Sequence, residues 1–414
     1  MRPAVVEVRR LGEHDLDAFA RCVETGFAVR FTQAKGDELV AGLDRDRALG
    51  AFDGLELVGT LAGYEAELTV PGPLCTPVLS LAEIAVLPTH RRRGVLTSLL
   101  RHAFDAGHAR GDRLCVLASS EGGIYGRFGF GVATAYQRYA LDRSVASLVE
   151  PAGAAAHGRV VLLEPSQAAG ALALVFDAAR RARAGELGRT PAYFEELVST
   201  ASDAGGPVRF FAFYEEAGTL DGYAVYDVAP SVDPDLAYGP GRRVAMLEEC
   251  CTTSDASYSA LFTYLVGLDL TSGLRTGDRP VDEPLRYMLA DPRALRTTAR
   301  GDGLWVRVLD VPGALEARRY GSDGRSVIEL VDASCPWNAG CYAVEVVRGV
   351  ARVEPTRVAA ELTLDAGALA TCYLGGGSVT GLRTAGRAVE HVAGAAARLD
   401  ALLAWRPEPF CSTA

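Results

Sequence analysis

The stretch that decides the fold is Leu79–Phe104, which reads LSLAEIAVLPTHRRRGVLTSLLRHAF and predicts a strand, a basic turn and a helix. Apolar residues alternate along the strand, but the alternation slips by one residue between Ala82 and Glu83. A slip of this kind indicates a β-bulge, which bends a strand away from its neighbour. Pro88 ends the strand, and apolar residues at helical spacing then predict a buried helix from Gly94 onward.

The basic turn, Arg91–Leu96, combines the features of an anion-binding site. N–H groups at a helix start point outward with partial positive charge, and Gly94 lets a ligand approach the backbone closely. Three arginines add a positive field that suits phosphates. The turn lacks the Gly-Lys-Ser/Thr ending of a Walker loop and the three spaced glycines of a dinucleotide loop. The alternative is a solvated basic turn before an ordinary helix.

After a second apolar strand at Arg113–Ala118, the chain continues as SEGGIYGRFGFG from Ser120. Here it resembles the GNAT acyl-CoA N-acyltransferases, whose signature is R-x-x-G-x-(G/A) after a splayed strand and Y-x-x-x-G-F one strand later. Leu96 stands where a small residue is commoner. The strings PTHRRRG and SEGGIYGRFGFG are similar to the Eis (enhanced intracellular survival) branch of that superfamily. The residues that fit the signature are Arg91, Gly94, Tyr125, Gly129 and Phe130.

The composition narrows the possible partners. The chain has 414 residues, of which 49% are hydrophobic, and a net charge of −10. This length predicts roughly two to three domains. The acidic balance disfavours general nucleic-acid or anionic-membrane binding and suits a cationic substrate. No apolar run approaches about twenty residues and the N-terminus has no apolar leader segment, so we expect a cytoplasmic protein without a membrane partner.

Cysteines and histidines give no sign of a disulfide framework or a metal site. The nine cysteines show no C-x-x-C spacing, and the adjacent Cys250 and Cys251 cannot easily bridge each other. We interpret them as buried residues in a reducing compartment. The six histidines form no HExxH motif or His/Cys cluster, so no metal cofactor is expected.

The resemblance implies an α/β (α+β) fold with two GNAT-type acyltransferase domains, the second degenerate, followed by a sterol-carrier-protein-like α+β domain. The string LWVRVLDVPGALEAR from Leu304 and the later YLGG are similar to the sterol-carrier-like domain of Eis proteins. The predicted divisions are residues 1–142 for the catalytic GNAT N-acetyltransferase domain, 143–300 for the degenerate GNAT-like domain and 301–414 for the sterol-carrier-like domain.

In the first domain, hydrophobic periodicity predicts two further helices, at Asp15–Gly26 and Asp37–Leu43. A strand at Ala133–Leu141 is expected to close this domain. The other predicted strands are Val5–Arg10, Ala48–Phe52, Glu56–Tyr64 and Glu65–Val70.

The second domain is expected to repeat the first loosely, without a CoA site. Its glycine-rich basic segment, Gly239–Arg243, precedes a strand instead of following one into a helix, so it does not predict a phosphate loop. The predicted helices are Ala168–Arg183, Pro191–Ser202 and Tyr258–Leu268. The predicted strands are Val160–Glu164, Val208–Tyr214, Leu220–Val228 and Arg243–Glu249.

The third domain is expected to begin with a strand at Leu304–Val311 and a short Pro-initiated helix. Helices at Gly367–Leu374 and Ala393–Trp405 follow later. Between them, a meander is predicted from strands at Ser326–Asp332, Tyr342–Val347, Ala351–Val353 and Ala360–Leu364.

Acetyl transfer to an amine needs a neutral amine, a polarised thioester carbonyl and a proton for the departing thiolate. By the family pattern, Tyr125 is the candidate general acid, since a phenol with a pKa of about 10 is protonated at neutral pH. The acetyl-CoA site implied by the resemblance consists of Ile84, Ala85, Val86, Arg92, Arg93, Gly94, Val95, Leu96, Thr97, Ser120 and Glu121.

No side chain stands out as the base. In Eis-like enzymes this task is assigned to the carboxylate that ends the chain, which here belongs to Ala414. Eis-like chains usually end in phenylalanine, and we interpret this one as one residue short. Near the first helix end, Glu24 is the candidate for binding the cationic amine or, alternatively, a solvated helix-end carboxylate. Asp37 and Glu38 are further candidate acids for the same pocket.

The predicted function is therefore acetyl transfer from acetyl-CoA to amines of a cationic acceptor, of the aminoglycoside-antibiotic type, at several positions. Protein-lysine acetylation is an alternative within the same class. A lipid carrier that uses the third domain is the alternative from another class. The resemblance further implies a homohexamer, and the acidic balance predicts no nucleic-acid partner.

Overall fold

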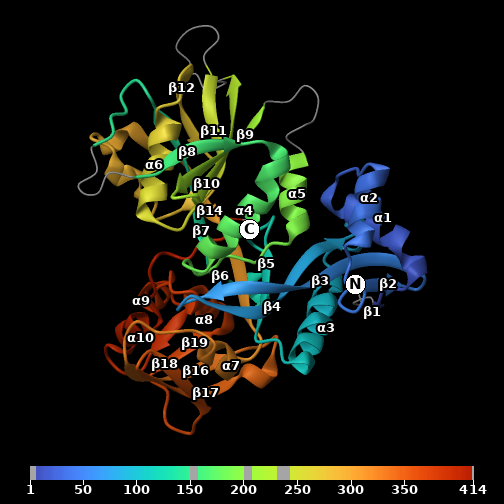
Figure 1. Cartoon of the computed structure of the whole chain (residues 1–414). Coiled ribbons are helices and arrows are strands. Elements are labelled where there is room, and N and C mark those ends of the chain that lie inside the picture. Colours follow the sequence, from blue (N-terminus) through green and yellow to red (C-terminus); the bar gives the residue numbers. More distant parts are fainter. Residues whose placement is uncertain (1–5, 150–156, 200–207, 231–242, 413–414) are drawn as a thin grey trace. The chain divides into compact units, whose positions relative to one another are not determined.

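The computed structural model of the chain describes residues 6–149, 157–199, 208–230 and 243–412 (Figure 1). The chain divides into two compact units. The first unit contains residues 1–68, 75–133 and 304–405, and the second contains residues 69–74, 134–303 and 406–414.

The first unit is built on a seven-stranded sheet with the order β1-β2-β3-β4-β5-β15-β6. β4 and β5 are parallel, and β15 lies antiparallel to both β5 and β6. A strand that follows residue 303 thus completes a sheet begun near the N-terminus. The strands are β1 (Glu7–Arg10), β2 (Leu49–Asp53), β3 (Glu56–Val70), β4 (Leu74–Val86), β5 (Leu114–Ala118), β6 (Gly131–Val132) and β15 (Leu304–Val308).

Helices cover both faces of this sheet. Leu57 packs in one buried cluster with α1 residues, and the next residue, Val58, packs in another with α3 residues. Because successive side chains of a strand point to opposite faces, α1 and α3 lie on opposite sides of the sheet. The helices are α1 (Leu16–Phe27), α2 (Gln33–Ala41) and α3 (Val95–Arg110).

Most predicted elements of this sheet are confirmed, and α3 begins one residue after Gly94 as expected. The separation of Glu56–Tyr64 from Glu65–Val70 is wrong, since both belong to the single strand β3. The side chains of β3 change along the strand from a buried run to alternating burial, but the chain makes no turn there. The change in pattern was wrongly interpreted as the end of one strand and the start of another.

The same unit contains a second sheet, formed by the C-terminal part of the chain, with the order β18-β17-β16-β19-β20. The predicted meander is wrong at its fourth strand, because β19 pairs in parallel with β16. The elements are α7 (Val311–Glu316), β16 (Gly324–Val331), β17 (Gly340–Val347), β18 (Val350–Pro355), β19 (Leu362–Asp365), α8 (Ala366–Tyr373), α9 (Val379–Thr384), β20 (Ala388–Glu390) and α10 (Ala395–Leu403).

The second unit has an eight-stranded sheet with the order β13-β7-β12-β11-β10-β9-β8, and β14 also pairs with β7. Its helices are α4 (Pro165–Arg180), α5 (Pro191–Ser199) and α6 (Asp255–Val266). Its strands are β7 (Ala135–Asp142), β8 (Arg159–Leu163), β9 (Arg209–Glu216), β10 (Thr219–Pro230), β11 (Arg243–Thr252), β12 (Thr271–Thr276), β13 (Arg279–Pro280) and β14 (Leu295–Asp302).

The strand predicted at Ala133–Leu141 exists as β7, but it does not close the first sheet. It pairs with β12, β13 and β14 of the second unit. Alternating side chains identify a strand without identifying its neighbours, and these three partners lie more than a hundred residues later in the chain. The divisions at residues 142 and 300 stay a prediction.

Candidate active site

The site begins where the pairing between β4 and β5 ends. The two strands pair at Leu79 with Cys115 and at Ser80 with Val116. Three residues further along β4, Glu83 has a φ of 48°, in the left-handed region that a glutamate seldom adopts. The backbone distortion predicted from the slip after Ala82 is thus confirmed at Glu83.

The distorted strand presents backbone N–H groups on its open side. Leu87 donates its N–H to the carbonyl of Val58 on β3, at 3.0 Å. Backbone N–H groups alternate sides along a strand, so those of Val86 and Ile84 point away from β3, toward the side from which β5 has separated. Ile84 and Val86 belong to the acetyl-CoA site that the resemblance implies.

The N-terminus of α3 follows directly. Gly94 is the N-cap residue, with a φ of 87° and no capping side chain. The first hydrogen bond within the helix joins the N–H of Ser98 to the carbonyl of Gly94. The N–H groups of Val95, Leu96 and Thr97 therefore precede the helical ladder and are available to an anion.

The three arginines of the turn differ in their contacts. Arg91 donates to the carbonyl of Gly26, at 2.9 Å, and Arg93 binds the carboxylate of Asp53, at 3.0 Å. Arg92 is exposed, has a φ of 60° and forms no ion pair with any residue that the structure describes. Arg92 is therefore the arginine whose charge is left for a phosphate.

After β5, Ser120 and Glu121 are exposed. Tyr125, four residues after Glu121, is buried. The Tyr125 ring meets Phe130 edge to face, with ring centroids 5.7 Å apart. Burial, and secondarily the charge of Glu121, raises the pKa of Tyr125 to about 12. Its hydroxyl has no hydrogen-bond partner within the described part of the chain, so it is free to donate.

The segment after Tyr125 is fixed by the C-terminal part of the first unit. Gly129 has a φ of 83°, and a β-carbon there would lie 2.9 Å from the guanidinium carbon of Arg307. A β-carbon on Gly131 would lie 2.3 Å from the carbonyl oxygen of Gly367 on α8. Both positions require glycine, because the backbone or a buried side chain occupies the space.

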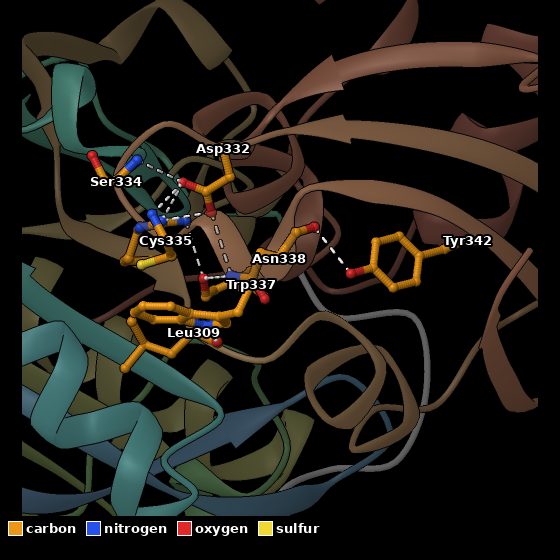
Figure 2. A network of polar contacts seen from close by, with 9 residues as sticks. Leu309, Asp332, Ser334, Cys335, Trp337, Asn338 and Tyr342 are labelled. Atoms are coloured by element: carbon orange, nitrogen blue, oxygen red, sulfur yellow. Dashed lines mark hydrogen bonds and ion pairs between the residues drawn. The ribbon is translucent and has the colours of Figure 1, made fainter.

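Arg307 is in turn held by a buried polar network around Asp332, which Figure 2 shows with Ser334, Cys335 and Asn338. Its guanidinium donates to both carboxylate oxygens of Asp332, at 2.7 and 2.6 Å. The same carboxylate accepts hydrogen bonds from the backbone of Ser334 and Cys335 and from the side chain of Asn338. The domain after β15 thus supports the tyrosine segment structurally.

Glu24, the residue predicted to bind the cationic amine, lies near the end of α1, beside the loop between α1 and α2. One carboxylate oxygen of Glu24 accepts the N–H of Phe31, at 2.6 Å, and fixes the loop. Its other oxygen has no partner among the described residues. Phe27, at the end of α1, and Val29, in the loop, are 45% and 44% exposed respectively.

The two further acidic candidates, Asp37 and Glu38, are exposed on α2. Asp37 accepts from Gln33, and Glu38 pairs with Lys35. Their charges are therefore partly engaged in contacts along their own helix.

Sequence reasoning overlooked the side chain of Glu83. It is half-buried, and its Oε2 accepts a hydrogen bond from the hydroxyl of Tyr64, at 3.1 Å. Burial raises its pKa. A charged residue inside the apolar run LSLAEIAV, at the very position of the bulge, was the signal available in the sequence.

In the second unit, the corresponding helix start, that of α6, is poorly suited to bind an anion. β11 leads into α6, the arrangement that β4 and α3 have in the first unit. The N-cap residue of α6 is Ser254, whose side chain accepts the N–H of Ser257, and Asp255 and Asp221 add negative charge. Both features disfavour a bound phosphate. The segment Gly239–Arg242 lies outside the described residues.

The end of the chain is fastened within the second unit as far as Ser412. Ser412 donates its N–H and its hydroxyl to Glu186 and accepts a hydrogen bond from Arg189, at 2.7 Å. Phe410 donates its N–H to the carbonyl of Ala184. Ala414, the predicted base, lies outside the described residues.

Within residues 6–149, 157–199, 208–230 and 243–412, no group of three or more His, Cys, Asp or Glu side chains could hold a metal ion. In the same residues, no helix combines the length and apolar character needed to cross a bilayer. All nine cysteines are free thiols.

Comparison with known proteins agrees with this geometry. Residues 7–133 and 185–308 each match an acetyltransferase (GNAT) domain family, and residues 311–412 match the sterol carrier protein domain family. An uncharacterized N-acetyltransferase of Streptomyces avermitilis is 34% identical over 421 residues, which cover 99% of this chain and 99% of that protein.

Two further relatives carry the Eis name. The N-acetyltransferase Eis of Mycobacterium tuberculosis is 36% identical over 362 residues, which cover 86% of this chain and 85% of that protein. The crystal structure of Eis1 from Mycobacterium abscessus aligns with a TM-score of 0.86 at 31% identity and covers 98% of this chain and 99% of that chain.

The splayed strand, the open helix start and the matching domains define a GNAT acetyltransferase, which uses acetyl-CoA as the acetyl donor. Two such domains precede a sterol-carrier-like domain, and this confirms the predicted three-part fold. The chain belongs to the Eis family of GNAT N-acetyltransferases, as the strings PTHRRRG and SEGGIYGRFGFG had predicted.

Proposed function

We propose that the chain transfers acetyl groups from acetyl-CoA to primary amines of a polycationic acceptor of the aminoglycoside type, at more than one position. The observation that carries the proposal is the pairing of β4 with β5 at two positions, followed directly by the uncapped start of α3. This donor set suits a thioester and a diphosphate. The exposed loop between α1 and α2, which Glu24 of α1 fixes, suits a bulky cationic amine.

In this proposal the backbone of β4 orients the thioester. The N–H groups of Ile84 and Val86 donate to the pantetheine arm and to the carbonyl oxygen, which polarises the carbonyl for attack. The N–H groups at the start of α3, with Arg92 and Arg93 near them, bind the diphosphate. Ser120 and Glu121 border the arm from the end of β5.

Tyr125 donates a proton to the departing sulfur. Burial keeps the phenol protonated, because its pKa is raised to about 12. The phenolate that would result is therefore high in energy, so the proton transfer is coupled to the breaking of the C–S bond. The resemblance assigns the role of base to the carboxylate of Ala414, and this assignment stays a prediction.

The test is release of free thiol from acetyl-CoA by the full chain, with aminoglycosides, simple polyamines and lysine peptides as acceptors in parallel. The proposal predicts turnover that saturates with an aminoglycoside and products that carry more than one acetyl group. Turnover with lysine peptides but not with aminoglycosides would move the assignment to protein acetylation. No acceptor-dependent thiol release over the whole panel would refute it.

Two other expectations stay predictions. The homohexamer can be tested by sedimentation velocity of the full chain. The lipid-carrier alternative can be tested by whether a lipid co-purifies with the full chain.

A further inference from the structure

We propose that Asp53 is a positioning residue for the acetyl donor. Through Arg93 and His90 it holds residues 88–94, the diphosphate turn, in the conformation that binds acetyl-CoA. The inference rests on the proposed function and adds to its donor site a residue of β2 that lies outside the strings PTHRRRG and SEGGIYGRFGFG.

The backbone of the diphosphate turn is strained at Arg92. Arg92 has a φ of 60° and Gly94 has a φ of 87°, so both residues are in the left-handed region. Glycine adopts this conformation freely, but an arginine keeps it only where the surroundings enforce it. The side chain of Arg92 forms no ion pair with the described residues, so contacts of its neighbours must hold the turn.

The residues on either side of Arg92 are bound to two different elements. Arg91 donates to the carbonyl oxygen of Gly26 in α1, at 2.9 Å. Arg93 donates to Oδ2 of Asp53, the last residue of β2, at 3.0 Å. Because one neighbour is held by α1 and the other by β2, the backbone between them has little freedom, and this enforces the conformation of Arg92.

Asp53 contacts the diphosphate turn a second time, at His90. Nε2 of His90 lies 3.4 Å from Oδ2 of Asp53, and Nδ1 lies 2.8 Å from the hydroxyl oxygen of Thr89. The side chain of His90 is only 11% exposed, so its ring is confined by packing as well. One carboxylate oxygen of Asp53 thus joins two separate residues of the turn, His90 and Arg93, to β2.

The position of Asp53 is itself fixed by the hairpin of β2 and β3. Gly54 follows it with a φ of 64°, and Asp53 pairs with Glu56 across the turn of the hairpin. The preceding residue, Phe52, is buried and pairs with both β1 and β3. A side chain carried by the end of a paired strand is placed more precisely than one carried by a loop.

A carboxylate beside an anion-binding turn calls for a physical reason, because its charge repels a phosphate. If Asp53 acted on the ligand only through its charge, its removal would free the charge of Arg93 and strengthen the binding of acetyl-CoA. If Asp53 positions the turn, its removal lets Arg92 relax and weakens that binding. The two roles therefore predict changes of opposite sign.

The experiment is calorimetric titration of acetyl-CoA into the full parent chain, Asp53→Ala and the control Glu56→Ala. Glu56 is an exposed carboxylate of the same hairpin and forms no ion pair with the described residues. We expect Asp53→Ala to raise the Kd of acetyl-CoA about fivefold, because binding must then order a turn that the parent chain holds in advance. Glu56→Ala should leave the Kd unchanged.

A truncated donor separates positioning of the turn from general damage to the site. Acetyl-pantetheine has the thioester and lacks the diphosphate, so its use should not depend on the diphosphate turn. With the same aminoglycoside as acceptor, Asp53→Ala should raise the KM for acetyl-CoA about fivefold at unchanged kcat. With acetyl-pantetheine its kcat/KM should equal that of the parent chain, whereas a merely structural residue would affect both donors.

The double variant Asp53→Ala/Arg93→Ala tests whether Asp53 acts through Arg93. A carboxylate that only holds Arg93 in place leaves no contact for the second replacement to remove, so the double variant should bind acetyl-CoA as Asp53→Ala does. Weaker binding by the double variant would show that Arg93 itself contacts the diphosphate, and would overturn this route.

Unchanged or tighter binding of acetyl-CoA by Asp53→Ala overturns the proposal, and so does an equal loss of activity with both donors. Asp53→Asn, which keeps the shape of the side chain and removes its charge, gives the same test if Asp53→Ala does not fold. Failure of the proposed function looks different, because the parent chain would then bind acetyl-CoA and release no thiol with any amine. No binding of acetyl-CoA by the parent chain would refute the donor site and this proposal together.

Discussion

The guanidinium of Arg307 and the carboxylate of Asp332 form an ion pair at 2.6 Å, with 0% and 1% of the two side chains exposed. Arg307 belongs to β15 of the acetyltransferase sheet, and Asp332 directly follows β16 of the sterol-carrier-like sheet. Arg307 also lies against Gly129, four residues after the proposed acid. The pair therefore joins the C-terminal domain to the segment that carries Tyr125.

Replacement of Asp332 by alanine should strongly destabilise the first unit. It leaves a buried guanidinium without its counterion, which costs about 3–5 kcal/mol. Urea unfolding should show the loss. The exposed pair of Arg352 and Glu354 provides the control, and Glu354→Ala should change stability by less than about 1 kcal/mol. Equal effects of the two replacements would contradict this account of the pair.

Gly131→Ala should displace the tyrosine segment. The new methyl group would lie 2.3 Å from the carbonyl oxygen of Gly367 and 2.5 Å from the backbone nitrogen of Thr371, and neither can move without moving α8. We expect a fall in both the melting temperature and kcat. Gly36→Ala is the matched control, because nothing lies within 4 Å of its β-carbon and it sits in α2. A fully active, stable Gly131→Ala chain would be inconsistent with this packing.

Tyr125→Phe should lower kcat by about 100-fold and leave the KM for acetyl-CoA nearly unchanged, because it removes a proton donor and keeps the ring. The acid works only while protonated, so its activity is lost as pH rises through its folded-state pKa of about 12. Rates measured up to the ordinary phenol value of 10.0 should thus show no decline due to Tyr125. The exposed Tyr287 offers the control, Tyr287→Phe. An alkaline decline near the ordinary value that disappears in Tyr125→Phe would be the contrary result.

Ser412→Ala should loosen the end of the chain. Ser412 bonds both Glu186 and Arg189, which are buried, and leaving them without this partner costs about 1–3 kcal/mol. Carboxypeptidase should then release C-terminal residues faster. Ser144→Ala, which removes an exposed hydroxyl of the same unit, should leave the release rate unchanged. If Ser412→Ala also leaves the release rate unchanged, the contacts of Ser412 do not hold the end of the chain.

The sequence predicted the structure best at positions where one residue or a short pattern determines the local backbone conformation. The slip after Ala82, Pro88 and Gly94 each have a local conformational cause, so the distorted strand and the start of α3 could be predicted within a residue. The partners of β7 and β19 could not, because strand pairing depends on residues distant in the chain. The same reason hid the insertion of β15 between β5 and β6.

The site was predicted less completely than the fold. The basic turn was recognised, but not that Arg91 and Arg93 have internal partners, which leaves Arg92 for a phosphate. Glu83 was noticed as the position of a bulge, but its hydrogen bond with Tyr64 was not foreseen. That contact depends on a residue nineteen positions earlier in the chain, which the local sequence does not reveal.

Calorimetric titration of acetyl-CoA into the full chain, alongside Arg92→Ala and Arg93→Ala, tests the central claim that the opened β4 and the start of α3 bind the acetyl donor. The account predicts saturable binding to the parent chain. Loss of one charge-assisted contact costs about 1.5–3 kcal/mol, so Arg92→Ala should weaken affinity at least about tenfold. Arg93, which is engaged with Asp53, should matter less. No binding to the parent chain, or equal affinity in Arg92→Ala, would contradict the account.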